Sequence, residues 1–256
     1  FDGGSTTKKN VGRYTIYSYL KHCGVRKLDY VFVSHPDKDH INGIYELIEM
    51  RDNTFEIGTV VLPEIRRTMA VKKQAGDDMS KLEKTLKAAG INVVYAVAGD
   101  CIKSGEFSVK CMHPCDGYDY ESANDYSAVY LVEYGDFSML MTGDAEKKAE
   151  KCIVEDVNRI AGDADTSARL VSVNILKVGH HGSKGASSEE FLSYIKPETA
   201  LISCGAGNSY GHPHTETLKR LSGIKAKVYR TDESGEIAVR VREGSYKIEM
   251  FKELKG

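Results

Sequence analysis

The segment 34–40, Ser-His-Pro-Asp-Lys-Asp-His, decides the fold of this chain. The apolar run Tyr30-Val31-Phe32-Val33 before it is typical of a buried strand, and the run 41–48 after it has helical apolar spacing. Ligand-type side chains therefore cluster where a strand ends and a helix begins. This is the place where α/β folds usually bind their ligands.

Imidazole and carboxylate groups, the common ligands of zinc and neighbouring divalent ions, fill four positions of this segment. In an extended turn His35, Asp37 and Asp39 would point to one side. His40 breaks the alternation and would point elsewhere. Four ligands pointing in two directions suit two metal ions better than one. The alternative, a charged surface turn, fits any one of these residues but does not explain the cluster.

Polar residues also follow three later apolar runs. The run 107–112 ends at His113, and the run 137–141 ends in Thr-Gly-Asp, with Asp144 at the start of a helix. The run 171–178 ends in Gly-His-His-Gly-Ser. Neighbouring side chains on an extended segment point opposite ways, so we expect only one of His180 and His181 to reach a metal. Taken alone, His113 fits a structural role and Asp144 fits a helix N-cap.

The pattern His-x-Asp-x-Asp-His resembles the signature of the metallo-β-lactamase superfamily, in the variant where Asp replaces the usual second His. Together with Asp2-Gly3-Gly4, Thr142-Gly143-Asp144 and the Asn-x-Tyr-Gly-His-Pro turn at 208–213, it resembles the hydrolase domain of ComEC/Rec2-type competence proteins. The matches extend from residue 2 to residue 212. The resemblance implies an α/β fold, the four-layer αββα sandwich, formed by one domain over residues 1–256 with its N-terminal strand truncated.

The resemblance also implies two bound divalent ions, with zinc expected first and manganese as its competitor. The implied ligands are His35, Asp37 and His113 for one ion, and Asp39, His40 and His181 for the other, with Asp144 bridging the two. We favour His181 over His180 because Gly commonly follows the last ligand of the superfamily. Asp2 would hold the metal loop without binding metal.

Further roles follow from the same resemblance. The residues implied in catalysis are Asp39, His180, Lys184 and His212, and those implied in substrate contact are Asn124, Ser127, Ser183, Asn208 and Tyr210. His212 would donate to an anion or protonate the leaving group. Turn-forming roles for Asn124, Ser127 and His212 remain open alternatives.

The implied function is phosphodiester hydrolysis, on DNA, by a hydroxide that bridges the two metals. One alternative is acyl hydrolysis of a lactone, thioester or β-lactam, since the fold permits both chemistries. A second alternative is a non-catalytic module of DNA-uptake assembly. The complete ligand set argues against that second alternative.

Composition narrows the class of protein. The chain has 256 residues, 41% hydrophobic and 28% charged, which is ordinary for a soluble globular protein. No apolar run approaches 18 residues, so we expect no transmembrane helix in this chain, although relatives of this type carry the domain on a membrane channel. The net charge of −2 lacks the basic excess of a dedicated duplex-DNA binder. The basic pairs 66–67, 72–73 and 147–148 fit solvated faces.

The cysteines and the first residue of the chain bear on the cellular compartment of the protein. The six cysteines show no zinc-finger spacing, and their even number leaves disulfides in a secreted protein open. We favour reduced thiols, and the cytoplasm slightly over secretion. The chain begins at Phe1 without an initiator Met, so we expect a segment upstream. Composition does not predict an oligomeric state.

Overall fold

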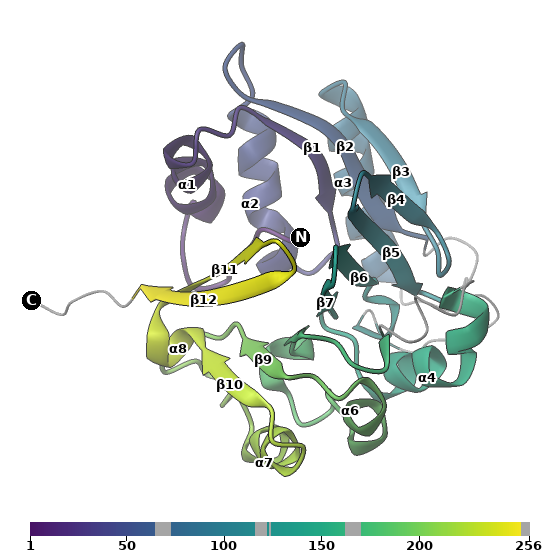
Figure 1. Cartoon of the computed structure of the whole chain (residues 1–256). Coiled ribbons are helices and arrows are strands. Elements are labelled where there is room, and N and C mark those ends of the chain that lie inside the picture. The colour runs from purple at the N-terminus through teal and green to yellow at the C-terminus, as the bar shows by residue number, and fades with distance from the viewer. Residues whose placement is uncertain (65–72, 116–121, 123, 162–169, 252–256) are drawn as a thin grey trace, which may run out of the picture. The chain divides into compact units, whose positions relative to one another are not determined.

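The structure is a computed structural model that describes residues 1–64, 73–115, 122, 124–161 and 170–251 (Figure 1). It divides into two compact units. Unit 1 comprises residues 1–96 and 117–128, and unit 2 comprises residues 97–116 and 129–256. Neither unit is a continuous segment, because the chain passes between them after residues 96, 116 and 128. The expectation of a single domain stays a prediction.

Unit 1 is built on a parallel sheet whose described strands are β1 (Lys27–Phe32), β2 (Glu56–Pro63) and β3 (Asn92–Ala96) in that order. Parallel neighbours need a crossover connection, which helices supply here. The described helices of unit 1 are η1 (Gly12–Ile16), α1 (Tyr17–His22), α2 (Lys38–Glu49), α3 (Lys73–Ala88) and η2 (Asn124–Tyr126). The π-helix η1 runs directly into α1, so the two form one continuous helical segment.

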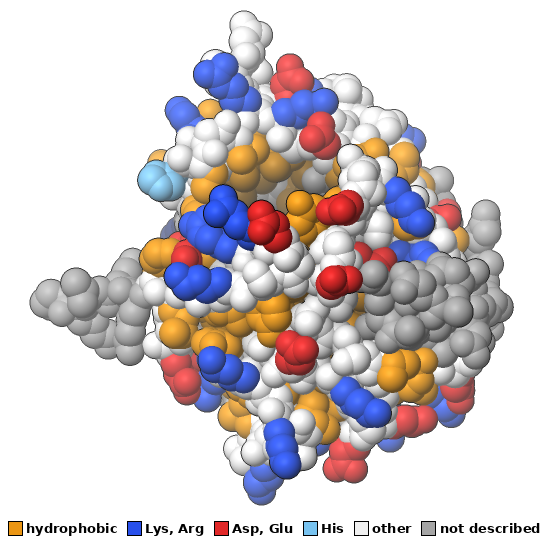
Figure 2. All heavy atoms as spheres, in the orientation of Figure 1, with side chains coloured by type: hydrophobic (Ala, Val, Ile, Leu, Met, Phe, Trp, Pro, Cys, Tyr) orange, Lys and Arg blue, Asp and Glu red, His pale blue; other side chains and the backbone are white. Residues whose placement is uncertain are grey.

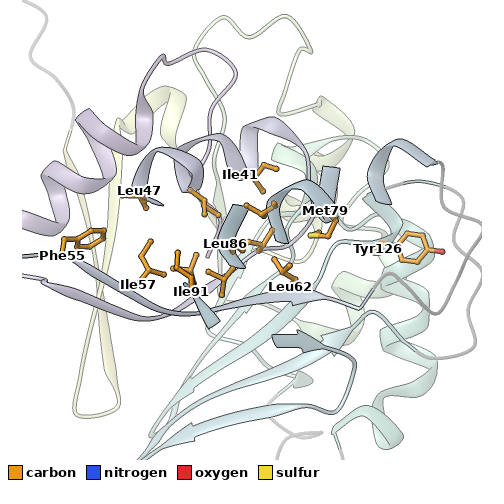
Figure 3. Packing of buried hydrophobic residues seen from close by; sticks show 14 residues of the cluster. Ile41, Leu47, Phe55, Ile57, Leu62, Met79, Leu86, Ile91 and Tyr126 are labelled. Atoms are coloured by element: carbon orange, nitrogen blue, oxygen red, sulfur yellow. The ribbon is translucent and has the colours of Figure 1, made fainter. Parts of the chain in front are cut away.

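The core of unit 1 lies between its sheet and the helices α2 and α3 (Figure 3). Helix α2 buries Ile41, Ile44 and Leu47, which share one face at three-residue spacing. Helix α3 buries Leu82 and Leu86 in the same way, each with no exposed surface. This core fixes the end of β1 and the start of α2, between which the ligand-rich segment lies.

Unit 2 is built on a mixed sheet in the order β10-β9-β8-β7-β6-β5-β4. Its strands are β4 (Cys101–Ser104), β5 (Phe107–His113), β6 (Val129–Tyr134), β7 (Phe137–Met141), β8 (Ile175–Lys177), β9 (Thr199–Ile202) and β10 (Lys227–Arg230). Its described helices are α4 (Lys147–Ala161), η3 (Gly179–Gly182), α6 (Glu189–Ile195), α7 (Thr215–Gly223) and α8 (Thr231–Ser234). Parallel pairing joins β7, β8, β9 and β10, so the carboxyl ends of these strands lie at one edge of the sheet.

The three C-terminal strands of unit 2 do not all join one sheet. Only β10 joins the large sheet, whereas β11 (Glu236–Arg242) and β12 (Ser245–Phe251) pair with each other as a separate antiparallel hairpin. Alternate residues of this hairpin, among them Val239 and Ile248, pack against Phe137, Ile175 and Leu201 of the large sheet. Burial of that apolar face explains why the hairpin covers the sheet instead of extending it.

Three further observations concern the predictions about cysteines, membrane-spanning helices and basic pairs. The thiols of Cys115 and Cys152 are joined as a disulfide, so the expectation of six reduced thiols is wrong for this pair, whose partners lie 37 residues apart in sequence. Among the described residues, no helix is both long and apolar enough to span a membrane. Lys147 and Lys148 are exposed as expected, whereas residues 66, 67 and 72 of the other basic pairs lie outside the described residues. On the face drawn in Figure 2, Lys and Arg side chains are interspersed with Asp and Glu side chains.

Candidate metal centre

The ligand-rich segment of unit 1 emerges from β1 and runs directly into α2. Asp37 has extended backbone (φ −68°, ψ 148°) at the N-cap position, and α2 begins at the next residue. Asp39 and His40 therefore lie in the first helical turn. The expected alternation along an extended turn is wrong, because helix geometry replaces it after Asp37. Gly4 allows the N-terminal loop to approach this turn, since a Cβ there would lie 2.4 Å from the carbonyl carbon of Asp39.

The helical start sorts the four side chains into two pairs. His35 Nε2 lies 3.6 Å from a carboxylate oxygen of Asp37, and His40 Nε2 lies 4.0 Å from one of Asp39. Both imidazoles are buried, with ring centroids 4.0 Å apart, whereas the Asp37 side chain is half exposed. Each pair therefore combines one buried nitrogen with one more accessible oxygen.

Asp2 orients both imidazoles, that of His40 directly and that of His35 through Ser34. Its carboxylate accepts hydrogen bonds from Ser34 N and Ser34 Oγ, each at 2.7 Å, and from His40 Nδ1 at 2.8 Å. His35 Nδ1 lies 3.0 Å from the same Ser34 hydroxyl. Burial disfavours the Asp2 carboxylate most strongly, yet the bonds and charges of His40 and Ser34 together lower the pKa of Asp2 to about 2. Because Nδ1 of each ring is engaged in this way, Nε2 is the nitrogen that is available to bind a metal ion.

In unit 2, the turns after β7 and β8 pack against each other. Asp144 follows β7 and is 3% exposed, and His180 N donates to Gly143 O at 3.1 Å. Gly179 is needed at this contact, because a Cβ there would lie 2.7 Å from the carbonyl oxygen of Ala145. Thr142 Oγ1 donates to Lys177 O and ties the two strand ends together.

His180 and His181 both reach Asp144. His181 Nε2 lies 3.7 Å from Asp144 Oδ1, and His180 Nε2 lies 3.8 Å from Asp144 Oδ2. The expectation that only one imidazole points this way assumed an extended segment. That assumption is wrong, because both residues adopt left-handed backbone, with φ of 45° and 53°. One carboxylate therefore faces two imidazoles, one on each oxygen.

Each of these imidazoles also has an outer partner on Nδ1. His181 Nδ1 donates to the backbone oxygen of Ser203 at 2.7 Å, and His180 Nδ1 donates to Glu146 Oε1 at 2.7 Å. The hydrogen bond from His180 lowers the pKa of Glu146. The sequence-based interpretation missed Glu146, although its place two residues after Asp144, at the start of a helix, is a usable signal. Ser183 is buried, and its hydroxyl donates to the same Glu146 carboxylate at 3.3 Å.

The turn 205–213 brings His212 beside these residues. Its ring centroid lies 5.5 Å from that of His180 and 6.4 Å from that of His181. Asn208 closes the turn, accepting from His212 N at 2.9 Å and donating to His212 O at 2.6 Å, and Tyr210 stacks on His212 at 5.8 Å while 69% exposed. Burial first, then the charges of His180, His214 and His181, lower the pKa of His212 to about 4. His212 is then neutral at pH 7, which favours hydrogen-bond donation over proton donation.

The remaining candidates lie as follows. His113 ends β5 fully buried, and its ring lies near the Cys115 and Cys152 sulfurs, with the three ligand-type atoms within 4.8 Å of one another. Lys184 is exposed, and its backbone N donates to His214 Nδ1 at 3.1 Å. Ser127 is buried in unit 1 and donates through its N to Asn124 O at 3.0 Å, as the turn alternative requires.

These donor sets fit divalent metal. Two atoms bound to one ion at 2.0–2.1 Å in tetrahedral geometry lie about 3.3 Å apart. The carboxylate–imidazole spacings of 3.6–4.0 Å within each unit are close to that value. Outer hydrogen bonds on the Nδ1 atoms are typical of metal-binding histidines. The residues present therefore fit the two divalent ions that the sequence resemblance implies.

Comparison with solved structures defines the class. The metallo-β-lactamase fold protein YhfI from Bacillus subtilis aligns with a TM-score of 0.52 at 11% identity, over 97% of this chain and 85% of that one. CmlA, a diiron β-hydroxylase from Streptomyces venezuelae, aligns with a TM-score of 0.53 at 13% identity, over 80% of this chain and 44% of that one. The chain has the α/β fold of the metallo-β-lactamase class.

Three curated proteins from different bacteria are similar to the chain over most of its length. The chain is 30% identical to ComE operon protein 3 of Bacillus subtilis over 91% of its own length, and 28% identical to Recombination protein 2 of Haemophilus influenzae over 93%. It is 26% identical to Competence protein ComA of Neisseria gonorrhoeae over its whole length. The chain spans only about a quarter to a third of these relatives, 27%, 26% and 31% respectively. None of the protein-family models matches the chain.

Proposed function

We propose that this chain is a metal-dependent phosphodiesterase that acts on DNA. The observation that carries the proposal is the Asp144 carboxylate with the Nε2 atoms of His180 and His181 at 3.8 and 3.7 Å from its two oxygens. A carboxylate with an imidazole nitrogen near each of its oxygens has further donors available on both sides, which suits a metal-bridging ligand. The carboxylate–imidazole pairs of unit 1 supply donors of the same kind.

The proposed ligands of two divalent ions are His35, Asp37 and His113 for one, and Asp39, His40 and His181 for the other, with Asp144 shared. Zinc or manganese suits such mixed nitrogen and oxygen donors. When bound, two such ions supply a nucleophilic hydroxide at neutral pH and stabilise both the attacking and the leaving oxygen of an in-line displacement. His180 lies within reach of Asp144 Oδ2 and therefore stands as a further donor beside this set.

The chain's own residues then orient and neutralise the substrate. His212, neutral at pH 7, donates a hydrogen bond to a phosphoryl oxygen, and the exposed ammonium of Lys184 attracts the same anion. Exposed Tyr210 lies at the rim of this turn, where its ring can contact a base or sugar. Asn208 shapes the turn, and Ser183 acts through Glu146. Support for DNA as the substrate comes from the relatives, whose names refer to competence and recombination.

The test is hydrolysis of bis-p-nitrophenyl phosphate and of single- and double-stranded DNA, with zinc and manganese in turn. Wild type is compared with Asp144→Ala and with Asp136→Asn, a matched control in the exposed turn before β7. We expect cleavage by wild type and Asp136→Asn and none by Asp144→Ala. Metal binding without phosphodiester cleavage, accompanied by hydrolysis of a lactone or thioester, would move the assignment to acyl substrates. Metal binding without any turnover would support a non-catalytic assembly module.

A further inference from the structure

The loop that follows His181 contains a second site of unfavourable backbone geometry. Ser187 has φ of 56°, a left-handed conformation that side chains with a Cβ rarely adopt, and it is 1% exposed. His180 and His181 share this conformation a few residues earlier. Such backbone strain costs free energy, and it persists only where several contacts from the surrounding structure hold the residue in that conformation. The contacts that hold Ser187 therefore bear on the geometry of the whole loop.

Glu150 holds the amide side of Ser187. Its two carboxylate oxygens accept the backbone N–H groups of Ser187 and Ser188, the second at 2.8 Å. Glu150 is 2% exposed, and it lies one helical turn beyond Glu146, which accepts from His180. Glu146, which directly precedes α4, and Glu150 in the first turn of α4 thus hold the two ends of the segment 180–188.

Arg220 holds the carbonyl side. Its Nε donates to Ser187 O at 2.7 Å, and its Nη2 donates to Ala186 O at 2.8 Å and to Lys184 O at 3.0 Å. Thr217, one turn earlier on α7, donates to Ser183 O at 2.8 Å. The guanidinium matches this geometry because its donors form a rigid planar fork. Ser187 is therefore held at its N–H by a carboxylate of α4 and at its C=O by a guanidinium of α7.

We propose that Glu150 and Arg220 are positioning residues for the metal-binding turn at His180 and His181, acting through the strained backbone of Ser187. The proposal rests on the proposed function only in taking this turn as part of the metal centre. If either contact is lost, Ser187 relaxes towards negative φ. Loss of Arg220 leaves the carbonyl oxygens of Lys184, Ala186 and Ser187 without this donor, and loss of the Glu150 carboxylate leaves two backbone N–H groups without their acceptor. In either case the chain between Ser187 and His181 moves. The two imidazoles leave the positions they hold beside Asp144.

The test compares Glu150→Gln and Arg220→Met with the matched controls Glu190→Gln and Lys219→Met, both exposed in unit 2. Zinc affinity is measured by competition with a chromophoric chelator, and the thermal midpoint is measured on the metal-free protein. We expect a 10–100-fold loss of zinc affinity in Glu150→Gln and Arg220→Met, the size typical of losing an outer partner of a ligand. We expect their midpoints to fall by about 5–10 °C. The controls should match wild type in both measurements.

A double variant separates positioning from plain stabilisation. Glycine adopts positive φ without penalty, so Ser187→Gly added to Arg220→Met should restore zinc affinity to within about threefold of wild type. A fallen midpoint with zinc affinity within twofold of wild type would overturn the proposal, leaving a purely structural clamp. Failure of Ser187→Gly to restore affinity would overturn the role of backbone strain. No substrate enters these measurements, so they stand whether or not the chain hydrolyses phosphodiesters.

Discussion

The two units hold their ligand-type residues in contrasting ways. In unit 1, His35, Asp37, Asp39 and His40 come from one short segment, and the single carboxylate of Asp2 and the hydroxyl of Ser34 orient its imidazoles. In unit 2, the candidates come from the ends of β5, β7 and β8, and the outer partners are Glu146, directly before α4, and Ser203, directly after β9. Local sequence thus builds one donor set, whereas sheet pairing and helix packing build the other.

The contrast has a consequence for robustness. A donor set within one turn of chain keeps its geometry if distant packing loosens, because few residues separate its members. A donor set built from separate strand ends depends on every contact that fixes those ends. Damage to packing should therefore disturb the donor geometry more in unit 2 than in unit 1.

The largest effect is expected at Asp144, where unit 2 concentrates two imidazoles on one carboxylate. Asp144→Asn keeps the shape but removes the charge that two cations would share. We expect phosphodiester cleavage to fall about a thousand-fold or more, which corresponds to about 4 kcal/mol of transition-state stabilisation. Steady-state kinetics with bis-p-nitrophenyl phosphate measure this, with Asp136→Asn as the control. Retention of a tenth of wild-type activity would exclude a bridging role.

A core substitution in unit 1 tests the independence of its donor set. Leu82→Ala removes a fully buried side chain of α3 and should lower the free energy of unfolding by about 2–5 kcal/mol. Because the ligand-rich segment is local, zinc affinity at a temperature where the variant is folded should change less than threefold. Denaturant unfolding and chelator competition provide the two readouts. A loss of zinc affinity as large as that of Asp2→Asn would contradict the contrast.

Asp2 is the outer partner on which unit 1 depends. Asp2→Asn removes the ionised acceptor of His40 Nδ1 and Ser34 and should weaken zinc binding 10–100-fold. Asp29→Asn, an exposed carboxylate on β1 paired with Lys27, is the control and should leave affinity unchanged. Equal affinities for wild type and Asp2→Asn would show that helix α2 alone orients His40.

The smallest effect concerns pH and the His212 turn of unit 2. The folded state lowers the pKa of His212 to about 4 from its ordinary value of 6.5. The unfolded state therefore binds the proton first as pH falls from 6.5 to 4, and stability present above pH 6.5 is lost across that window. Since His212 is only partly buried and solvent screens its charge, we expect a loss of only about 1 kcal/mol.

Urea unfolding of the metal-free protein at pH 7 and pH 4 measures this loss. His212→Gln should remove about that much of the pH dependence, whereas His22→Gln, exposed on α1, should keep the wild-type profile. An unchanged profile in His212→Gln would show that the turn leaves the imidazole solvated like a free side chain.

Sequence patterns predicted the fold class and the strand ends that carry polar residues, because both depend on apolar periodicity and on residue type. They located His35, Asp144 and His181 at the ends of runs that are strands in the structure. The same patterns failed for backbone conformation at His180 and His181, since left-handed geometry in non-glycine residues has no sequence signature. They also failed for the hairpin of β11 and β12, whose alternation does not reveal which sheet it covers.

By itself, then, the sequence determined that imidazoles and carboxylates follow buried strands in an α/β chain, because ligand chemistry is a property of side chains and strand position is a property of local apolar pattern. Only the tertiary structure decided that His180 and His181 both face Asp144, and that Glu146, Glu150 and Arg220 hold their loop. Those contacts join residues more than thirty positions apart in sequence. The spacing along the chain does not encode them, because they exist only once sheet pairing and helix packing have brought α4, α7 and the loop together.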